Sequence, residues 1–139
     1  GTDSEGFDGR YINQWKMVQK CFELMEAEEE AIKGCPRSEY VIRARPDLRV
    51  ACLPFALQRG AGSKAYLALQ ERLWGSDNFF FGDYNSMRTV CCGIAPKYDE
   101  YTSMLGQASS EPMMQRHIEE VGLEEKVIRF ARCVSVDRT

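Results

Sequence analysis

The chain has 139 residues, of which 44% are hydrophobic and 28% are charged, and this composition predicts a single globular domain with a sizeable core. Its 18 Lys+Arg and 21 Asp+Glu give a net charge of −3, which argues against a broad basic surface for nucleic acid. No stretch approaches the roughly 20 apolar residues of a membrane span, and the polar, acidic residues 1–10 do not resemble a signal peptide.

A long helix is the first expected element. Residues 1–10 are rich in Gly, Asp and Ser, which is typical of a flexible, irregular N-terminal arm. An apolar stripe then recurs at alternating four- and three-residue steps, formed by Tyr11, Trp15, Val18, Phe22 and Met25. This spacing predicts a helix from about Tyr11 to Lys33 that packs on a sheet through the stripe. We expect residues 11–139 to form one α/β domain.

The next expected element is a strand from Glu39 to Arg45. There one set of residues, Tyr40, Ile42 and Ala44, alternates with a second set, Val41, Arg43 and Arg45, which is a period-2 pattern. Tyr, Val and Ile also suit a pleated surface. Pro46 has no N–H to donate, so pairing should stop there and leave Asp47 just beyond the carboxyl end. We expect this strand to be central and Asp47 to lie where open α/β sheets bind ligands. The alternative is a surface Arg–Asp ion pair that caps the strand.

The middle of the chain is expected to hold an extended segment, a loop and a helix. Leu48 to Pro54 should continue in extended geometry, and the glycines between Arg59 and Ser63 predict a loop. Ser63 is a suitable cap for a helix that carries Leu67 and Leu69 toward Trp74.

Three consecutive phenylalanines, residues 79–81, form a short buried-strand pattern between polar turn residues. Asp83 is well placed to cap the helix that follows, from Tyr84 to Cys92. Asp77 lies just before the phenylalanines and has no comparable local task. It is therefore a better candidate for a functional site than Asp83.

The C-terminal third is expected to hold two helices and a strand. Pro96 suits the first turn of a helix through Leu105, and Ser109 or Ser110 opens another with Glu111 near its N-terminus. The second helix has an apolar stripe formed by Met113, Met114, His117, Ile118 and Val121, in which we expect His117 to be a core residue. Val127 to Val136 alternates and predicts a last strand.

The cysteines argue against a structural zinc site. The six cysteines contain no C-x-x-C spacing, and the chain has one histidine. Their even number permits disulfides, but a chain with this many core residues does not need them, so the redox compartment stays open.

The order of the motifs resembles one family. A helix containing Gln-Trp is followed by YVIRARPDL (40–48), SDNFFFGDYNSM (76–87), SSEPMMQRHIEEVGL (109–123) and a strand that ends in arginine. This order is similar to glycosyltransferase-like proteins of the GT-A type, the nucleotide-diphospho-sugar transferases. There the strand typically reads YDxVIRxRPD, a later turn reads NDxFxxGxxxM, and a helix opens with Pro-Glu or Ser-Glu before MxxHLxxxG. The resemblance covers roughly Gln14 to Arg138 and implies a small mixed sheet packed by helices, as in part of a GT-A fold.

The resemblance also implies a site. Asp47 would lie near a divalent cation, Mn or Mg, and the diphosphate of a nucleotide sugar. Arg43 and Arg45 would support that carboxylate or contact the donor phosphates, because guanidinium groups suit both partners. Asp77 would face sugar hydroxyls with Glu111 on the same rim, and either carboxylate can serve as base for the hydroxyl of a glycan or other acceptor.

The chain departs from the family pattern in two places. Where a D-x-D motif would hold the metal, it reads Arg45-Pro46-Asp47, with one carboxylate. Only residues 1–10 and one helix precede Tyr40, so we expect the N-terminal nucleotide-binding half to be missing. The chain would then be an excised piece, a shortened relative, or a subunit that assembles with a protein partner. Two functions therefore stay open: sugar transfer, in a truncated or inactive form, and a non-catalytic structural or interaction subunit that reuses the fold.

Overall fold

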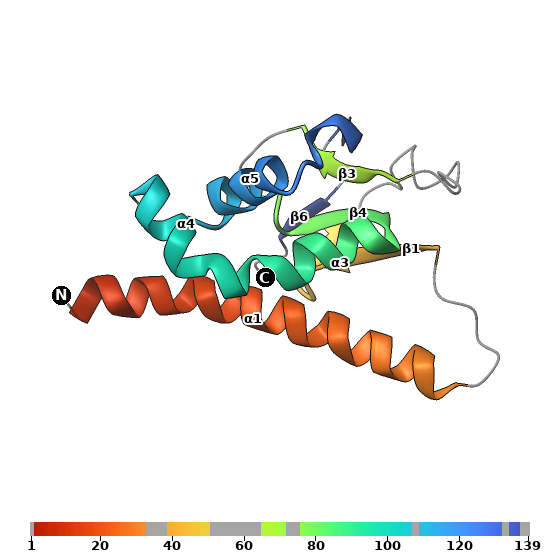
Figure 1. Ribbon diagram of the computed structural model, residues 1–139, viewed down its shortest axis with the longest axis horizontal. Coiled ribbons are helices and arrows are strands. Elements are labelled where there is room, and N and C mark those ends of the chain that lie inside the picture. The colour runs from red at the N-terminus through yellow and green to blue at the C-terminus, as the bar shows by residue number, and fades with distance from the viewer. Residues whose placement is uncertain are drawn as a thin grey trace.

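The computed structural model describes residues 2–32, 39–50, 65–71, 76–106, 109–131 and 134–136, and it is a mixed α/β fold (Figure 1). The helices are α1 (Thr2–Ala31), α3 (Tyr84–Gly93), α4 (Tyr98–Leu105) and α5 (Ser110–Glu120), with short 3₁₀ turns η1 (Ala95–Lys97) and η2 (Glu124–Lys126). The strands are β1 (Tyr40–Ala44), β2 (Leu48–Val50), β3 (Leu67–Gln70), β4 (Phe79–Asp83), β5 (Val127–Phe130) and β6 (Val134–Val136). This agrees with the small mixed sheet packed by helices that the sequence predicted.

Four strands form the main sheet in the order β1-β4-β3-β5, and β2 pairs with β6 separately. Strand β4 pairs antiparallel with β1 and β3, whereas β3 and β5 are parallel. The strand at Tyr40–Ala44 formed as predicted, but its central position was wrong, because β1 is at the edge of the described sheet. The side chains of β1 alternate between exposed and partly buried, which is typical of a strand with one solvated face, whereas every residue of β3 is buried.

The main core lies between the helices and one face of the sheet. Trp15, Val18 and Phe22 of α1 are buried there, as predicted, together with Leu67 of β3 and Phe80 of β4. The opposite face carries a smaller aromatic cluster made of Tyr66, Ala68, Phe79, Phe81 and Phe130, with Leu48 of β2 packed against it. Each face of β3 and β4 is therefore covered, which explains why these strands have no polar alternation.

Helix α1 begins at Thr2, so the irregular structure expected for residues 1–10 was wrong for residues 2–10. No proline interrupts residues 2–31, and extending an existing helix adds one hydrogen bond for each further residue that is ordered. Figure 1 shows α1 as one long rod along the lower side of the molecule, lying against α3.

Two further expectations were wrong. Leu67–Gln70 is strand β3 and not part of a helix. The prediction was wrong because a short, fully buried strand has a continuous apolar run, which periodicity alone does not distinguish from a buried helix. The expected last strand is two strands, β5 and β6, that belong to different sheets. The loop at residues 59–63, its Ser63 cap and the helix end at Trp74 lie outside the described residues.

The predicted helix boundaries around residues 83–122 were confirmed. Asp83 caps α3 by accepting a hydrogen bond from Ser86 N at 3.3 Å, and it also accepts one from Tyr66 N at 2.8 Å. Pro96 lies in the 3₁₀ turn that leads into α4, and Ser109 is the N-cap of α5. Among the described helices, none combines the length and apolar content that a membrane span requires.

Candidate functional site

Asp77 lies at the centre of a partly buried polar cluster formed by Gln14, Arg43, Asp77, Ser110 and Glu111, which we call the Asp77 site. The Asp77 side chain is only 4% exposed and lies in the turn before β4. Its Oδ2 accepts hydrogen bonds of 2.7 Å from Gln14 Nε2 and 2.7 Å from Ser110 Oγ. Helix α1, the turn and the first residue of α5 therefore meet at one carboxylate oxygen.

Glu111 supplies a second carboxyl group to this site. It is half-buried and shares a hydrogen bond with the Asp77 carboxyl. Burial, then the negative charge of Asp77, then this hydrogen bond raise the pKa of Glu111 to about 7. Around neutral pH, Glu111 can therefore both give and take a proton, which is what a general acid or base needs.

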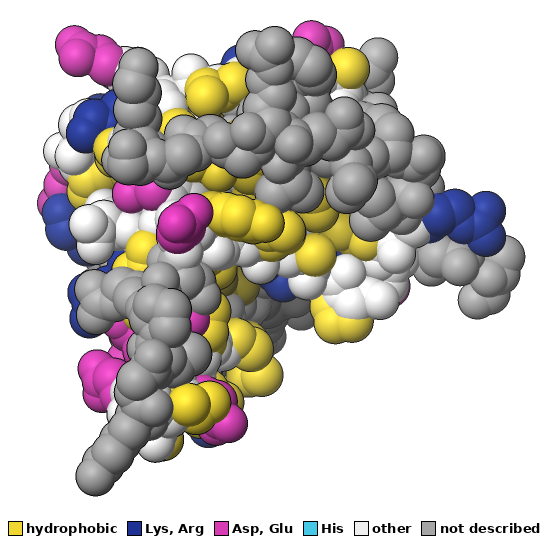
Figure 2. Space-filling view, turned by 90° about the vertical axis from the view of Figure 1, so that its right-hand side faces the viewer, with side chains coloured by type: hydrophobic (Ala, Val, Ile, Leu, Met, Phe, Trp, Pro, Cys, Tyr) yellow, Lys and Arg dark blue, Asp and Glu magenta, His cyan; other side chains and the backbone are white. Residues whose placement is uncertain are grey.

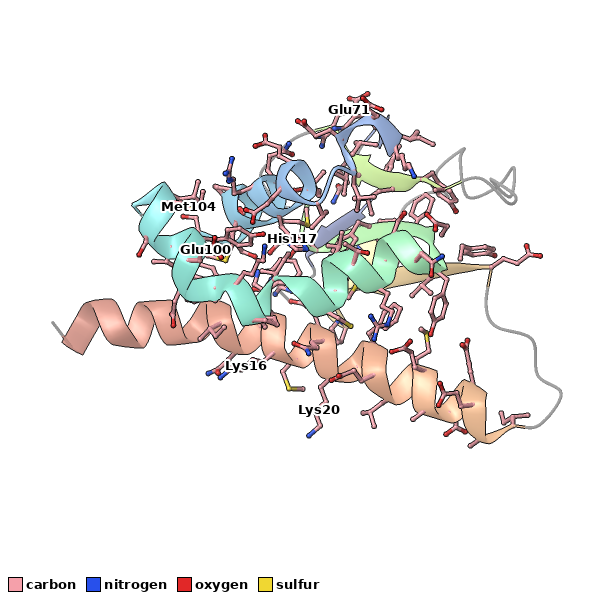
Figure 3. The ribbon with its side chains drawn as sticks, in the orientation of Figure 1. Lys16, Lys20, Glu71, Glu100, Met104 and His117 are labelled. Atoms are coloured by element: carbon pink, nitrogen blue, oxygen red, sulfur yellow. The ribbon has the colours of Figure 1, made fainter. Side chains whose placement is uncertain are left out.

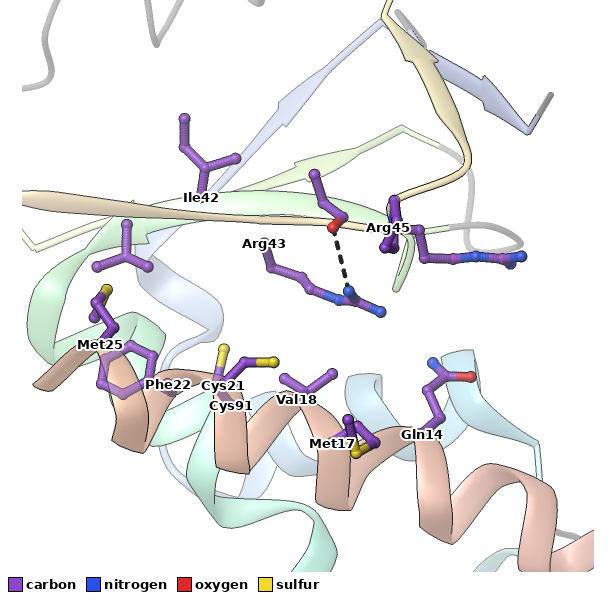
Figure 4. Close-up of a pocket in the computed structure, with 13 residues that line it drawn as sticks. Gln14, Met17, Val18, Cys21, Phe22, Met25, Ile42, Arg43, Arg45 and Cys91 are labelled. Carbon is purple, nitrogen blue, oxygen red and sulfur yellow. Dashed lines mark hydrogen bonds between the residues drawn. The ribbon is translucent and has the colours of Figure 1, made fainter. Parts of the chain in front are cut away.

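Arg43 brings the opposite charge. Figure 4 shows its side chain reaching from β1 into the space between β1 and α1, with Nη1 donating to the Ala44 carbonyl oxygen at 3.3 Å. Burial lowers the pKa of Arg43, and the charge of Asp77 opposes that effect. Its buried Nε has no hydrogen-bond partner among the described residues. A partly desolvated guanidinium is suited to an anionic ligand.

Arg45 and Asp47 form a separate ion pair at the end of β1. Arg45 Nε donates to Asp47 Oδ1 at 2.9 Å and Nη2 donates to Oδ2 at 2.6 Å, and both side chains are about two-fifths exposed. Arg45 Nη1 also donates to Asn78 Oδ1 at 3.3 Å. Arg45 thus links Asp47 to the turn that carries Asp77, and this is the strand-capping pair that was the alternative interpretation of the sequence.

The residues around Asp47 do not fit the expected divalent cation. Both carboxylate oxygens already accept hydrogen bonds from Arg45, so a metal would have to displace a bidentate guanidinium. Within the described ranges, no group of three or more His, Cys, Asp or Glu side chains could hold a metal ion.

A cavity of about 500 Å³ opens beside Arg43, between α1 and β1 (Figure 4). Its α1 wall includes Gln14, Met17, Cys21 and Met25, and its other wall is formed by residues 41–46. Gln14 lines the cavity and also donates to Asp77, so the cavity adjoins the Asp77 site. Apolar walls with a few polar groups at one end are typical of ligand-binding cavities.

His117 belongs to the core, as the sequence predicted. It is buried, and Figure 3 shows it inside the molecule, whereas Lys16 and Lys20 point outward from α1. Its Nε2 lies 2.9 Å from the Thr89 carbonyl oxygen, which can only accept, so Nε2 carries the proton. Its Nδ1 lies 2.6 Å from the Tyr101 hydroxyl and accepts from it. Burial lowers the pKa of His117, so the ring is a neutral structural link between α3, α4 and α5.

The sequence did not identify Gln14, Ser110 or Asn78 as site residues. Gln14 comes directly before Trp15, which belongs to the buried stripe of α1. A polar side chain beside such a stripe is the one sequence signal that could have indicated a buried polar contact there. Ser110 was noted only as a helix start. Asn78 follows Asp77 directly and became relevant only because strand pairing places it beside Arg45.

Comparison of the chain with family models, with curated proteins and with solved structures finds no match.

Proposed function

We propose that the Asp77 site transfers a sugar from a nucleotide-sugar donor to the hydroxyl group of an acceptor. One observation carries this proposal: Asp77 and Glu111 form a hydrogen-bonded carboxyl pair, and Gln14, which donates to Asp77, lines the same cavity as the partly buried Arg43. The carboxyl pair suits a hydroxyl group and the guanidinium suits a diphosphate. These are the two groups that sugar transfer must hold together.

The charges of Glu111, Arg43 and Asp77 suggest a role for each residue in the transfer. The acceptor oxygen attacks the anomeric carbon of the sugar, the bond from that carbon to the phosphate oxygen breaks, and the nucleoside diphosphate leaves with the electron pair. Ionised Glu111 takes the proton from the acceptor hydroxyl, and its pKa of about 7 suits that task near neutral pH. Arg43 stabilises the negative charge that develops on the leaving diphosphate. Asp77 holds the Glu111 carboxyl in place and keeps its pKa high.

A second function is favoured by a different observation. Asp47 is fully engaged by Arg45, which suits a structural ion pair better than a ligand site. In this alternative, the chain is a non-catalytic interaction subunit, and Arg43 would stabilise the fold rather than bind an anion.

Two variants with a matched control distinguish the functions. Arg43→Gln should abolish the binding of inorganic pyrophosphate, measured by calorimetry. Glu111→Gln should retain pyrophosphate binding but lose the release of nucleoside diphosphate, measured with a panel of UDP- and GDP-sugars and hydroxyl acceptors. Lys16→Gln removes a cation that points away from the site and should change neither readout. Absence of pyrophosphate binding in the parent protein, with an unfolded Arg43→Gln variant, would support the non-catalytic function.

A further inference from the structure

The cavity between α1 and β1 is mainly apolar. Most of its walls consist of Met, Val, Ile, Phe and Cys side chains from α1, from residues 41–42 of β1 and from Cys91 of α3. Its volume of about 500 Å³ lies within the range of about 300–1,000 Å³ that is usual for small-molecule sites. Because the burial of apolar surface drives binding in such a space, the walls favour a ligand with an apolar body.

The polar residues of the cavity lie together at one end. In Figure 4, Gln14 and Arg45 lie at this end and Arg43 points toward it, whereas Phe22 and Met25 lie at the opposite end. A ligand that fills the cavity therefore needs one polar end and one apolar end.

Gln14 offers a hydrogen-bond acceptor at the polar end. Its Nε2 donates to Asp77 Oδ2 at 2.7 Å and to Ser110 Oγ at 3.2 Å, which uses both N–H bonds of the amide. Its Oε1 accepts no hydrogen bond from the residues that the structure describes. A hydroxyl group can donate to this oxygen, whereas a carboxylate or an ether cannot.

The charges near the polar end are balanced. Arg45 is held by both carboxylate oxygens of Asp47, at 2.9 and 2.6 Å. Arg43 interacts electrostatically with Asp77, and in the proposed transfer it binds the diphosphate of the donor. Neither arginine is therefore left for an ionic group on the occupant of the cavity. Burying such a group without a partner is costly, so a neutral polar group fits this end best.

Negative charge also lies near the apolar end of the cavity. Residues 26–30, which follow the cavity-lining Met25 on α1, include four glutamates, and Glu28 and Glu30 are exposed. Figure 2 views the molecule from the side where α1 ends, and it shows acidic side chains among apolar ones in the lower part of the surface. This charge disfavours an anionic ligand that approaches from this side.

We propose that the cavity binds a neutral, apolar alcohol whose carbon chain lies between α1 and β1 and whose hydroxyl group lies at Gln14. The binding of the alcohol stands independently, whereas its role as the acceptor rests on the proposed sugar transfer. Gln14 links the polar end of the cavity to the carboxyl pair of Asp77 and Glu111 through its hydrogen bond to Asp77. In the transfer, the alcohol oxygen bonds to the anomeric carbon and its proton goes to Glu111, so the products are an alkyl glycoside and a nucleoside diphosphate.

A set of ligands with the same decyl chain tests the preference for a neutral hydroxyl group. Binding of decan-1-ol, decyl methyl ether, decanoate and decylammonium to the parent protein should be measured by calorimetry, at concentrations below those at which each ligand aggregates. Decan-1-ol should bind most tightly, and the ether, which cannot donate to Gln14 Oε1, should bind about fivefold or more weakly. Failure of decan-1-ol to bind overturns the proposal, as does equal binding of the ether or tighter binding of either ion.

Chain length tests the apolar walls. From hexan-1-ol to decan-1-ol, each added methylene group should tighten binding by about fourfold, because the cavity removes it from water. Affinity that does not rise with chain length would contradict the proposal.

Two phenylalanine substitutions on α1 locate the site. Cys21 lines the cavity and is exposed, whereas Leu24 is 61% exposed and is not a lining residue. Cys21→Phe should weaken decan-1-ol binding by about tenfold or more, as expected if the ring excludes two methylene groups from the cavity. Leu24→Phe should bind as the parent does. Equal affinity in Cys21→Phe and the parent protein would be evidence against this site.

Alkylation of the parent protein gives a second measurement if Cys21→Phe does not fold. N-ethylmaleimide should modify Cys21 several-fold more slowly at saturating decan-1-ol, whereas Cys92, which does not line the cavity, should react at an unchanged rate. Peptide mass mapping follows the two thiols separately. An unchanged rate at Cys21 would place the alcohol elsewhere and overturn the proposal.

The other occupant to test is a second copy of the chain. Sedimentation equilibrium should show that the parent protein is a monomer, and a dimer that Cys21→Phe dissociates would overturn the proposal.

Glu111→Gln separates the alcohol site from the proposed function. This variant should bind decan-1-ol as the parent does and should lose sugar transfer to it. Binding of decan-1-ol without transfer in the parent protein would remove the proposed function and keep the alcohol site. Transfer to hydrophilic acceptors without binding of decan-1-ol would keep the proposed function and remove the alcohol site.

Discussion

Gln14 Nε2 donates a 2.7 Å hydrogen bond to Asp77 Oδ2 across 63 residues of sequence. Gln14 also donates to Ser110 Oγ at 3.2 Å, so one amide holds the turn before β4 against the start of α5. The same glutamine lines the cavity between α1 and β1. Removing the amide would therefore disturb both the carboxyl pair and the cavity wall.

Glu111→Gln should change how the stability of the protein depends on pH. The folded-state pKa of about 7 lies above the ordinary value of 4.5, so the folded protein binds this proton more tightly than the unfolded chain. The resulting stabilisation is fully present below about pH 4.5 and is lost as pH rises through about 7. Urea midpoints should therefore fall more steeply over this range in the parent than in the variant. Parallel curves would contradict the raised pKa.

Phe80→Ala should destabilise the fold by about 3–5 kcal/mol, because a fully buried ring at the centre of the sheet leaves a cavity. The matched control is Tyr40→Ala, an aromatic truncation on β1 where the side chain is 44% exposed. Chemical denaturation should show a much smaller loss for the control. Similar losses for the two variants would mean that the core does not lie on the helix-covered face of β4.

Gly93→Ala tests the packing of the buried histidine. A Cβ at residue 93 would lie 2.5 Å from His117 Nε2, the atom that donates to the Thr89 carbonyl oxygen. The ring must shift, and such overpacking costs about 1–3 kcal/mol. In a double-mutant cycle with His117→Ala, the alanine at position 93 should become much less costly, because the clashing ring is gone. Additive effects would contradict this contact.

Asp47→Asn should change the free energy of unfolding by no more than about 1 kcal/mol, because the Arg45–Asp47 pair is partly exposed to solvent. Pyrophosphate binding should be retained in this variant, because the proposed anion site uses Arg43 and not Asp47. A loss of pyrophosphate binding with unchanged stability would instead assign the anion site to the end of β1.

Local signals in the sequence predicted the elements that depend on local chemistry. The alternation in β1, the Asp83 cap and the stop at Pro46 each depend on neighbouring residues, and all three were confirmed. Leu67–Gln70 was predicted as helix because its strand character comes only from burial between β4 and β5. The edge position of β1 likewise depends on pairing with a strand far along the chain.

The candidate site could be predicted only in part, because most of its contacts join residues that are distant in sequence. Asp77 was singled out because it had no local task, and its partners are indeed distant in sequence. Gln14 and Ser110 could not be assigned to it from sequence, because their contacts exist only once α1 and α5 pack beside the turn. Arg43 and Arg45 are two residues apart and looked equivalent in the strand pattern. Arg45 lies just beyond the end of β1, however, and only Arg45 reaches Asp47.

The pH dependence of sugar transfer is the most direct test of the roles proposed for Glu111 and Asp77. Nucleoside-diphosphate release should be measured in the parent protein and in Glu111→Gln, with nucleotide sugars and a hydroxyl acceptor at saturating concentration. We expect a rate that rises with pH, with an apparent pKa of about 7, and that is lost in the variant at every pH. Release that is independent of pH across this range, or equal in parent and variant, would contradict the assignment of Glu111 and Asp77 as the catalytic pair.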